Sequence, residues 1–143
     1  MKEVRGNLWD YHDKGCWIAI TTNGNVKANG HAVMGRGVAL EAARRFPTTP
    51  YIVGKYLKEL GNIPIRLGDK MYTFPTKHNW WDKSDLVLIE NSARSLADMV
   101  DRSGTKEIYL PRPGCGNGQL DWEDVKPILE KYLDDKFIVV SIV

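Results

Sequence analysis

The sequence predicts an α/β domain: a three-layer α/β/α sandwich with a mixed, mostly parallel central sheet. Short apolar segments rich in β-formers alternate along the chain with amphipathic helical patterns, as in sheets that helices cover on both faces. Several of the apolar segments lack polar alternation, which indicates strands buried on both faces. At 143 residues, with 43% hydrophobic and 27% charged side chains, the chain fits one globular domain over 1–143.

Composition also excludes several classes of protein. No apolar run approaches the roughly 20 residues of a membrane helix, and the N-terminal segment lacks the apolar core of a signal peptide, so we expect a cytoplasmic protein. Cys16 and Cys115 are too few for a disulfide framework, and no Cys/His spacing resembles a zinc site, so we expect reduced cysteines, no metal and no cofactor. The net charge of +2 predicts no general affinity for nucleic acid, so any bound nucleotide needs a specific site.

The first half of the chain is predicted to hold three strands and two helices. The nearly continuous apolar run at 16–21 indicates a buried strand. The first helix must end near Pro47, and the second should end at Gly61, a residue typical of helix C-termini. The second helix is expected to bury Tyr51, Val53, Tyr56, Leu57 and Leu60. In chain order, the expected elements are a strand at 2–9, a polar connection at 10–15, a strand at 16–21, a loop at 22–31, helices at 38–46 and 50–60, a connection at 62–68 and a strand at 70–74.

The second half continues the alternation. Its clearest helix carries Leu86, Ile89 and Ala93 at three- and four-residue spacing, which defines one apolar stripe. Because a proline removes one backbone hydrogen bond, Pro127 should separate an initial 3₁₀ turn from the last helix. In chain order, the expected elements are a loop at 75–82, a helix at 84–103, a strand at 107–110, a glycine-rich turn at 111–120, a helix capped by Asp121 and a strand at 137–143.

Two strand-to-helix connections share one design, a glycine-rich turn that leads into a helix. In the segment 33–40, Gly35 and Gly37 precede a helix start, where unpartnered N–H groups and the helix dipole favour an anion. The second turn lies at 114–118. A plain turn without a ligand would show the same glycine pattern. In an open α/β sheet, however, both would lie at the carboxyl ends of strands, where together they would grip a diphosphate.

The ordered set of motifs resembles the macrodomain family over essentially the whole chain. The set comprises Gly6-Asn7-Leu8 on the first strand, Asn23 after the second, the segment 33–39, and Gly114-Cys115-Gly116 ahead of a helix with Trp122 and Glu123. Its Met-Gly-x-Gly and Gly-Cys-Gly motifs are similar to those of the terminal ADP-ribose protein glycohydrolases and of the bacterial antitoxins that remove ADP-ribose from DNA. The resemblance implies a macrodomain-like fold and an ADP-ribose site.

The resemblance also implies roles for individual residues. Asn7 would meet adenine where the family usually has aspartate, because its oxygen can accept from the adenine amino group; the alternative is a turn hydrogen bond. Asn23 would hold the distal ribose hydroxyls; the alternative is an Asx turn. The implied catalytic residues are Lys77 and Asn23. The implied ligand-binding residues are Gly6, Asn7, Leu8, Asn23, Met34, Gly35, Arg36, Gly37, Val38, Gly114, Cys115, Gly116, Asn117 and Gly118.

The catalytic expectation rests on Lys77, because Phe74-Pro75-Thr76-Lys77 resembles the loop that supplies a lysine in this branch. Such a lysine would attack the anomeric carbon of the distal ribose as an amine, or would stabilise a departing oxygen as an ammonium. An exposed surface lysine is the alternative. The terminal glycohydrolases place an aspartate where this chain has Gly118, so their acid/base partner is absent here. The antitoxin branch, whose loop is also glycine-rich there, resembles the chain better.

Two residues of the glycine loops are expected to act through their backbone alone. The side chain of Arg36 should point to solvent, because an anion cradle needs only N–H groups. Cys115 would be a candidate nucleophile, but a small residue packed in a tight turn is the favoured interpretation.

Histidines and tryptophans flank the expected site. His31 and His78 would suit general acid or base chemistry, but no partner is evident in the sequence, so exposed loop positions are expected. Trp80 and Trp81 would stack on a base attached to the ribose, or would cover the helix that begins near Leu86.

Together these features predict a monomer that binds ADP-ribose and hydrolyses an ADP-ribosyl linkage on protein, nucleic acid or a small derivative. ADP-ribosylated DNA is one candidate partner, and no membrane partner is expected. A second hypothesis, motivated by Gly118, is a non-catalytic ADP-ribose reader or sponge. A third is an ordinary dinucleotide-binding fold, which the missing third glycine and acidic residue disfavour.

Overall fold

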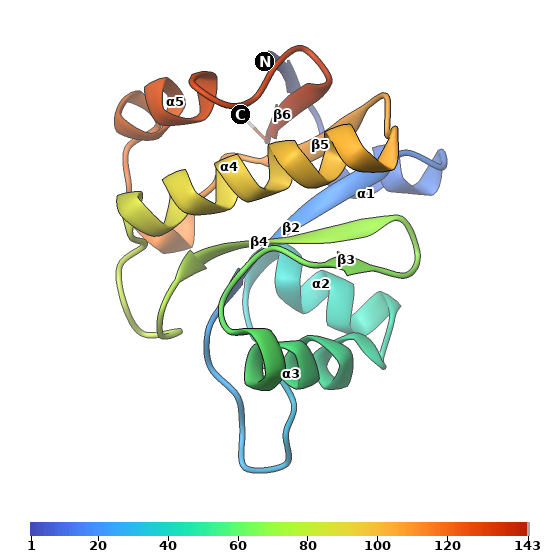
Figure 1. Cartoon of the computed structure of the whole chain (residues 1–143), viewed down its shortest axis with the longest axis vertical. Helices are drawn as coiled ribbons and strands as arrows, with labels where there is room; N and C mark the ends of the chain where they lie inside the picture. The colour runs from blue at the N-terminus through green and yellow to red at the C-terminus, as the bar shows by residue number, and fades with distance from the viewer. Residues whose placement is uncertain (143) are drawn as a thin grey trace.

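A six-stranded sheet forms the centre of the protein, and helices cover both of its faces (Figure 1). The computed structural model describes residues 1–142. The strands are β1 (Lys2–Arg5), β2 (Trp17–Asn23), β3 (Arg66–Leu67), β4 (Met71–Lys77), β5 (Ile108–Pro111) and β6 (Phe137–Ser141). The helices are α1 (Leu8–Asp13), α2 (Gly37–Arg45), α3 (Thr49–Leu60), α4 (Leu86–Ser103) and α5 (Trp122–Glu130), with a 3₁₀ turn, η1, at Gly116–Gly118.

The sheet has the order β1-β6-β5-β2-β4-β3. Neighbouring strands are parallel except β3 and β4, which are antiparallel. Parallel neighbours put the carboxyl ends of β2, β4 and β5 at one edge of the sheet, where ligands of α/β proteins collect. The predicted mixed, mostly parallel sheet is confirmed.

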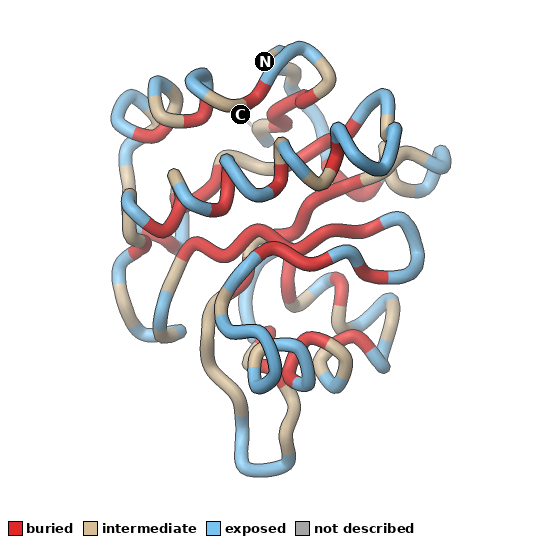
Figure 2. The backbone as a smooth tube through the Cα atoms, in the orientation of Figure 1, coloured by how far each residue is buried: buried red, intermediate tan, exposed pale blue. Residues whose placement is uncertain are grey.

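Two apolar cores lie on opposite faces of this sheet. Because successive residues of a strand face opposite sides, Ile18 and Ile20 of β2 enter one core and Ala19 enters the other. The first core packs against α1, α2 and α3, and the second packs against α4 and α5. Figure 2 shows the buried strands running between helices whose outer faces are exposed. The predicted three layers are therefore present.

The first predicted strand is too long. β1 ends at Arg5, and the segment expected as a polar connection contains α1 instead. The reason is local: the side-chain oxygen of Asn7 accepts the N–H of Trp9 at 2.9 Å and caps this short helix. Leu8 and Trp9 are then buried in the first core.

The region around β4 also differs from expectation. Residues 62–68 contain the short strand β3, and β4 runs on to Lys77, so that Pro75 lies in a strand and not in a loop. β3 pairs only with Met71 and Tyr72. Beyond Tyr72, β4 has no neighbouring strand on this side, which is where a sheet tolerates a proline.

Two helices differ from their predictions in detail. In α3, Val53 is buried as expected, but Tyr51 and Leu60 are 56% and 55% exposed. Tyr56, at 36%, is also exposed. A close approach explains this: α3 meets the backbone of Gly30 at Gly54, where a Cβ would overlap the carbonyl oxygen, so the helix face around Gly54 points inward.

α5 is a continuous α-helix through Pro127, without the expected 3₁₀ turn. The carbonyl that Pro127 leaves unpaired belongs to Glu123, on an exposed part of the helix, so water can bond to it. Asp121 lies at the N-cap position, but its side chain makes no capping hydrogen bond. The last predicted strand is β6, and Val143 lies outside the described residues. No helix within residues 1–142 combines the length and apolar character needed to cross a membrane.

Candidate functional site

A cavity of about 500 Å³ opens at the carboxyl edge of the sheet. The last residues of β2, β4 and β5, namely Asn23, Lys77 and Pro111, all line it. The remaining walls come from the two glycine-rich loops. Its lining residues are 21–23, 33–39, 76–77, 80, 84, 111–112 and 114–118. The structure therefore brings together most of the residues that the sequence singled out.

The first glycine loop forms one wall and leads directly into α2. Gly37 begins the helix with φ of +57°, a conformation that favours glycine. Arg36 is the N-cap and provides no side-chain hydrogen bond to the first turn, so backbone N–H groups there are available to a ligand. A Cβ on Gly37 would lie 3.6 Å from Nδ2 of Asn117, so the two glycine loops face each other closely.

The second glycine loop is held by backbone hydrogen bonds. The N–H of Leu120 donates to the carbonyl of Gly114, and the N–H of Ser84 donates to that of Gly118, each at 2.9 Å. Within this loop, Cys115 is half-buried and its thiol lies 3.8 Å from the carbonyl oxygen of Pro113. Burial raises the pKa of the Cys115 thiol, with a smaller opposing effect of Arg112. The favoured interpretation of Cys115 as a packed residue agrees with this environment.

Lys77 lies at the end of β4, opposite Asn23 of β2 in the parallel register. Its Nζ donates to the carbonyl oxygens of Trp80 at 3.3 Å and of Asn117 at 3.2 Å. Lys77 therefore ties the segment after β4 to the second glycine loop. None of the ion pairs within residues 1–142 includes this amine.

The side chain of Asn23 connects β2 to the first glycine loop. Its Nδ2 donates to the carbonyl of Val33, and its Oδ1 accepts the N–H of Asn25, both at 3.0 Å. The second contact is the Asx turn considered as an alternative. An amide has two N–H bonds and two lone pairs, so Asn23 keeps one of each for a ligand.

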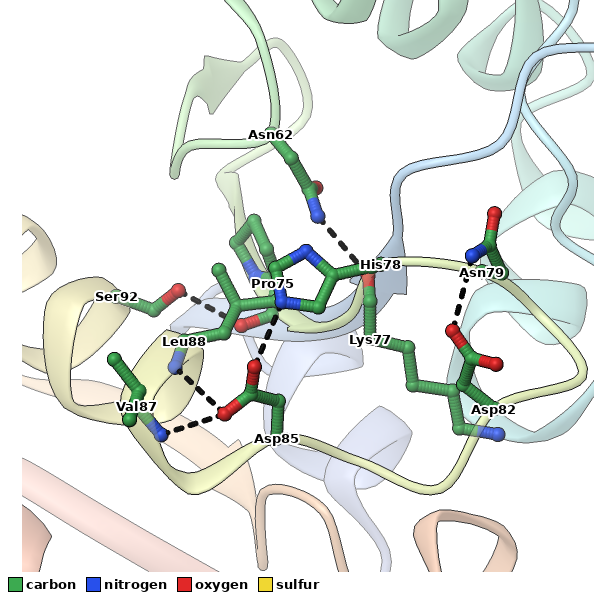
Figure 3. A network of polar contacts seen from close by, with 10 residues as sticks. All are labelled: Asn62, Pro75, Lys77, His78, Asn79, Asp82, Asp85, Val87, Leu88 and Ser92. Carbon is green, nitrogen blue, oxygen red and sulfur yellow. Dashed lines mark hydrogen bonds and ion pairs between the residues drawn. The ribbon is translucent and has the colours of Figure 1, made fainter.

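A polar network fixes the backbone on both sides of Lys77 (Figure 3). Asn62 donates to the backbone oxygen of Lys77 at 3.0 Å, and Ser92 donates to that of Pro75 at 2.7 Å. His78 contacts Asp85 at 2.7 Å, and Asp85 also accepts N–H groups at the start of α4. The His78 hydrogen bond is the main cause of the lowered pKa of Asp85.

His78 thus has a partner that its sequence position did not reveal, although it is exposed as expected. His31 is only half-buried and lies against the ring of Tyr51, at 5.9 Å between centroids. Neither histidine lines the cavity. The structure therefore favours the reading of both as loop residues over a role in acid or base chemistry at this site.

An aromatic and a cationic side chain meet at the cavity rim. Trp80 and Trp81 are 44% and 62% exposed, and their rings meet edge to face at 5.6 Å. The guanidinium of Arg36 lies 6.0 Å from the ring of Trp80, at the limit of a cation–π contact. Trp80 lines the cavity, whereas Trp81 does not.

Three expected adenine contacts lie outside the cavity lining. Gly6 precedes α1, Asn7 caps it through the turn hydrogen bond given above as the alternative, and Leu8 is its first, buried residue. Conversely, Thr76, Ser84 and Arg112 line the cavity without having been predicted. Arg112 lies in the predicted glycine-rich turn, but nothing in the sequence distinguishes Ser84 from other serines. Within residues 1–142, no three His, Cys, Asp or Glu side chains are placed to hold a metal ion.

No family model matches the chain. The DNA ADP-ribosyl glycohydrolase of Thermus aquaticus is 28% identical over an alignment of 144 residues, which covers 94% of this chain and 38% of that protein. The DNA ADP-ribosyl glycohydrolase of Mycobacterium tuberculosis is 34% identical over 107 residues, which cover 66% of this chain and 30% of that protein. The chain thus spans less than half the length of these relatives.

The solved structures extend the likeness to the backbone. The macrodomain of Mycobacterium tuberculosis DarG superposes with a TM-score of 0.76 at 25% identity, over 97% of this chain and 95% of that one. The chain therefore has the macrodomain fold, and its homologues include proteins named DNA ADP-ribosyl glycohydrolase.

Proposed function

We propose that the protein binds ADP-ribose in this cavity and hydrolyses an ADP-ribosyl linkage with the help of Lys77. The observation that carries the proposal is the position of Lys77, which lines the cavity at the carboxyl edge of the sheet and whose amine donates to Asn117 of the second glycine loop. The names of the homologues support the same class of reaction.

The glycine loops supply the binding part of the proposal. Backbone N–H groups at the start of α2, together with those of Gly116 and Asn117, suit the two phosphates of the ligand. The distal ribose then extends toward the side chains of Asn23 and Lys77, which are the last residues of strands β2 and β4. The loops bind and orient the ligand, while the strand ends carry the reactive groups.

The two hydrogen bonds of the Lys77 amine leave one position on its nitrogen free to contact a ligand. Two of its N–H groups donate to carbonyl oxygens. In the ammonium form the third N–H can stabilise a departing oxygen, and in the amine form the lone pair can attack C1″ of the ribose while the leaving group departs with the bonding electrons. Ring opening after attack gives a Schiff base that water hydrolyses.

The first test is calorimetry with ADP-ribose. We expect saturable binding to the wild-type protein, and weaker binding to Gly37→Ala because the added Cβ strains the first glycine loop. Gly61→Ala is the matched control: Gly61 also has positive φ, at +88°, but ends α3 away from the cavity. No measurable heat at high micromolar ADP-ribose would contradict the proposed function.

The second test removes the amine. Lys77→Ala should lower release of ADP-ribose by about 100-fold or more while binding persists, because a positioned catalytic group contributes at least this much. Borohydride added during turnover separates the two chemistries, since it traps a Schiff base as a stable adduct on Lys77 and leaves an electrostatic role without an adduct. Turnover by Lys77→Ala at the wild-type rate would remove Lys77 from the mechanism.

Trp80, which is exposed and lines the cavity, favours a substrate in which the ribose is attached to a nucleic-acid base. A base stacked on an aromatic ring is worth about 1–3 kcal/mol. We therefore propose ADP-ribosylated DNA as the preferred substrate over ADP-ribosylated protein. A panel of both substrates, with ADP-ribose 1″-phosphate as a small derivative, measures the preference.

One observation favours a non-catalytic reader as the second candidate function. Gly118 provides no carboxylate beside Lys77, and no acidic side chain in residues 1–142 pairs with this amine. A reader would bind ADP-ribose but release it from none of the substrates in the panel. The same experiments thus distinguish the two functions.

A further inference from the structure

Ser84 carries a buried hydroxyl without a hydrogen-bond partner. The residue is 6% exposed, and its Oγ contacts neither solvent nor any donor or acceptor within residues 1–142. Buried hydroxyls in proteins are almost always hydrogen-bonded. Ser92 shows the usual arrangement nearby, since its buried Oγ donates to the carbonyl of Pro75 at 2.7 Å.

The position of Ser84 connects it to the cavity. It is a lining residue, and its backbone N–H donates to the carbonyl of Gly118 at 2.9 Å. A Cβ on Gly118 would overlap Ser84 Oγ and lie 3.1 Å from Ser84 Cβ. The hydroxyl thus occupies the space that a side chain at position 118 would need. Lys77 contacts Asn117, the residue before Gly118, so Ser84 and Lys77 meet the same loop.

We infer that Ser84 is a ligand-binding residue of this cavity. When ADP-ribose binds, rotation about the Cα–Cβ bond turns Oγ toward the ligand, where it hydrogen-bonds an oxygen of the distal ribose beside Lys77. A hydroxyl suits this contact because it both donates and accepts. The segment before α4 thereby supplies the polar group that the second glycine loop cannot carry at Gly118. The inference rests on the proposed function, because it requires ADP-ribose in the cavity.

The test compares Ser84→Ala with Ser92→Ala by thermal unfolding without ligand and by calorimetry with ADP-ribose. Ser84→Ala should melt at or above the wild-type temperature, because it removes an unpaired buried polar atom, and should bind ADP-ribose about fivefold more weakly. Ser92→Ala should melt at a lower temperature, because it leaves the Pro75 carbonyl unpaired, and should bind ADP-ribose more tightly than Ser84→Ala does, because neither Ser92 nor Pro75 lines the cavity.

Two outcomes would overturn the inference. Wild-type affinity in Ser84→Ala would show that the hydroxyl does not contact the ligand. A lower melting temperature of Ser84→Ala would show that the hydroxyl already has a partner in the free protein. Absence of ADP-ribose binding to the wild type is a different result, which contradicts the proposed function itself.

A second pair of variants checks the steric relation. Gly118→Ala should lower the melting temperature because its Cβ overlaps Ser84 Oγ, and the double variant Ser84→Gly/Gly118→Ala should recover most of the loss. Failure of the double variant to recover would show that residue 84 does not restrict residue 118, which also overturns the inference.

Discussion

Cys115 shows how the environment of one residue decides between two chemistries. Its thiol lies in the second glycine loop, as an activated cysteine would, but burial there disfavours the thiolate and raises the pKa. A thiol in this state is a poor nucleophile near neutral pH. In the proposed mechanism the reactive group of the cavity is therefore Lys77 of β4, while Cys115 serves packing.

Alkylation tests this state of Cys115. We expect iodoacetamide to label Cys115 more slowly than a cysteine in an unstructured peptide at neutral pH. The labelling rate should still be rising above about pH 8.5, the ordinary pKa of a cysteine. Mass spectrometry of the labelled protein separates Cys115 from Cys16. Labelling of Cys115 faster than the peptide would indicate an activated thiolate.

Individual site residues were predictable where a motif identifies them. Lys77 and Asn23 follow from local sequence, and the structure places both at the cavity. Ser84 could not be found in this way. Its place depends on the backbone of Gly118, a residue far away in the sequence, and such packing leaves no local pattern.

At the scale of elements, Asp85 couples the start of α4 to the segment that carries Lys77. One carboxylate oxygen accepts the N–H of Val87 at 2.8 Å, and the other contacts His78 at 2.7 Å. In addition, the Asp85 N–H donates to the carbonyl of Thr76 at 2.9 Å. The cap of this helix thus also holds the end of β4.

Asp85→Ala should lower the free energy of unfolding by about 1 kcal/mol, the usual loss of an N-cap. The pKa of Asp85 is lowered in the folded protein, so its contribution is present above the ordinary aspartate pKa and is lost as the pH falls through the lowered value. The difference between wild type and variant should therefore narrow in urea unfolding at acidic pH. Asp85→Asn is the control, because asparagine also caps helices; an equal loss in both variants would contradict the capping role.

Long elements with a regular pattern were predictable, and short ones were not. The apolar stripe of α4 and the apolar run of β2 are both evident in the sequence. α1 and β3 are too short for a period. α1 is held by the burial of Leu8 and Trp9 in the first core, in addition to the Asn7 cap, and β3 is held by antiparallel pairing with β4. Such elements follow from tertiary structure more than from local preference.

At the scale of the molecule, one sheet separates two cores, so the helices of both faces depend on the same strands. This arrangement predicts a single cooperative unfolding transition. The parallel arrangement of the strands also explains why the sequence predicts the position of the cavity but not the shape of its walls. Parallel strands place their carboxyl ends together, whereas the walls depend on how the loops pack.

Leu96→Ala tests this coupling. Leu96 is fully buried between α4 and the sheet, so its truncation should lower the free energy of unfolding by about 2–5 kcal/mol. Val87→Ala on the same helix is the control: Val87 is 67% exposed, and the change should stay within about 0.5 kcal/mol. Fluorescence and circular dichroism should report one shared midpoint for Leu96→Ala. Separate midpoints would show that the two faces unfold independently.

The outer edge of β4 affects whether two molecules can pair through their sheets. Beyond its pairing with β3, this edge offers little to an incoming strand: Pro75 has no N–H, Ser92 occupies the Pro75 carbonyl, and Asn62 occupies that of Lys77. Unpaired strand edges are the usual starting points of intermolecular sheet growth and aggregation. The contacts that hold the Lys77 segment in place therefore also hinder strand pairing between molecules along this edge of the sheet.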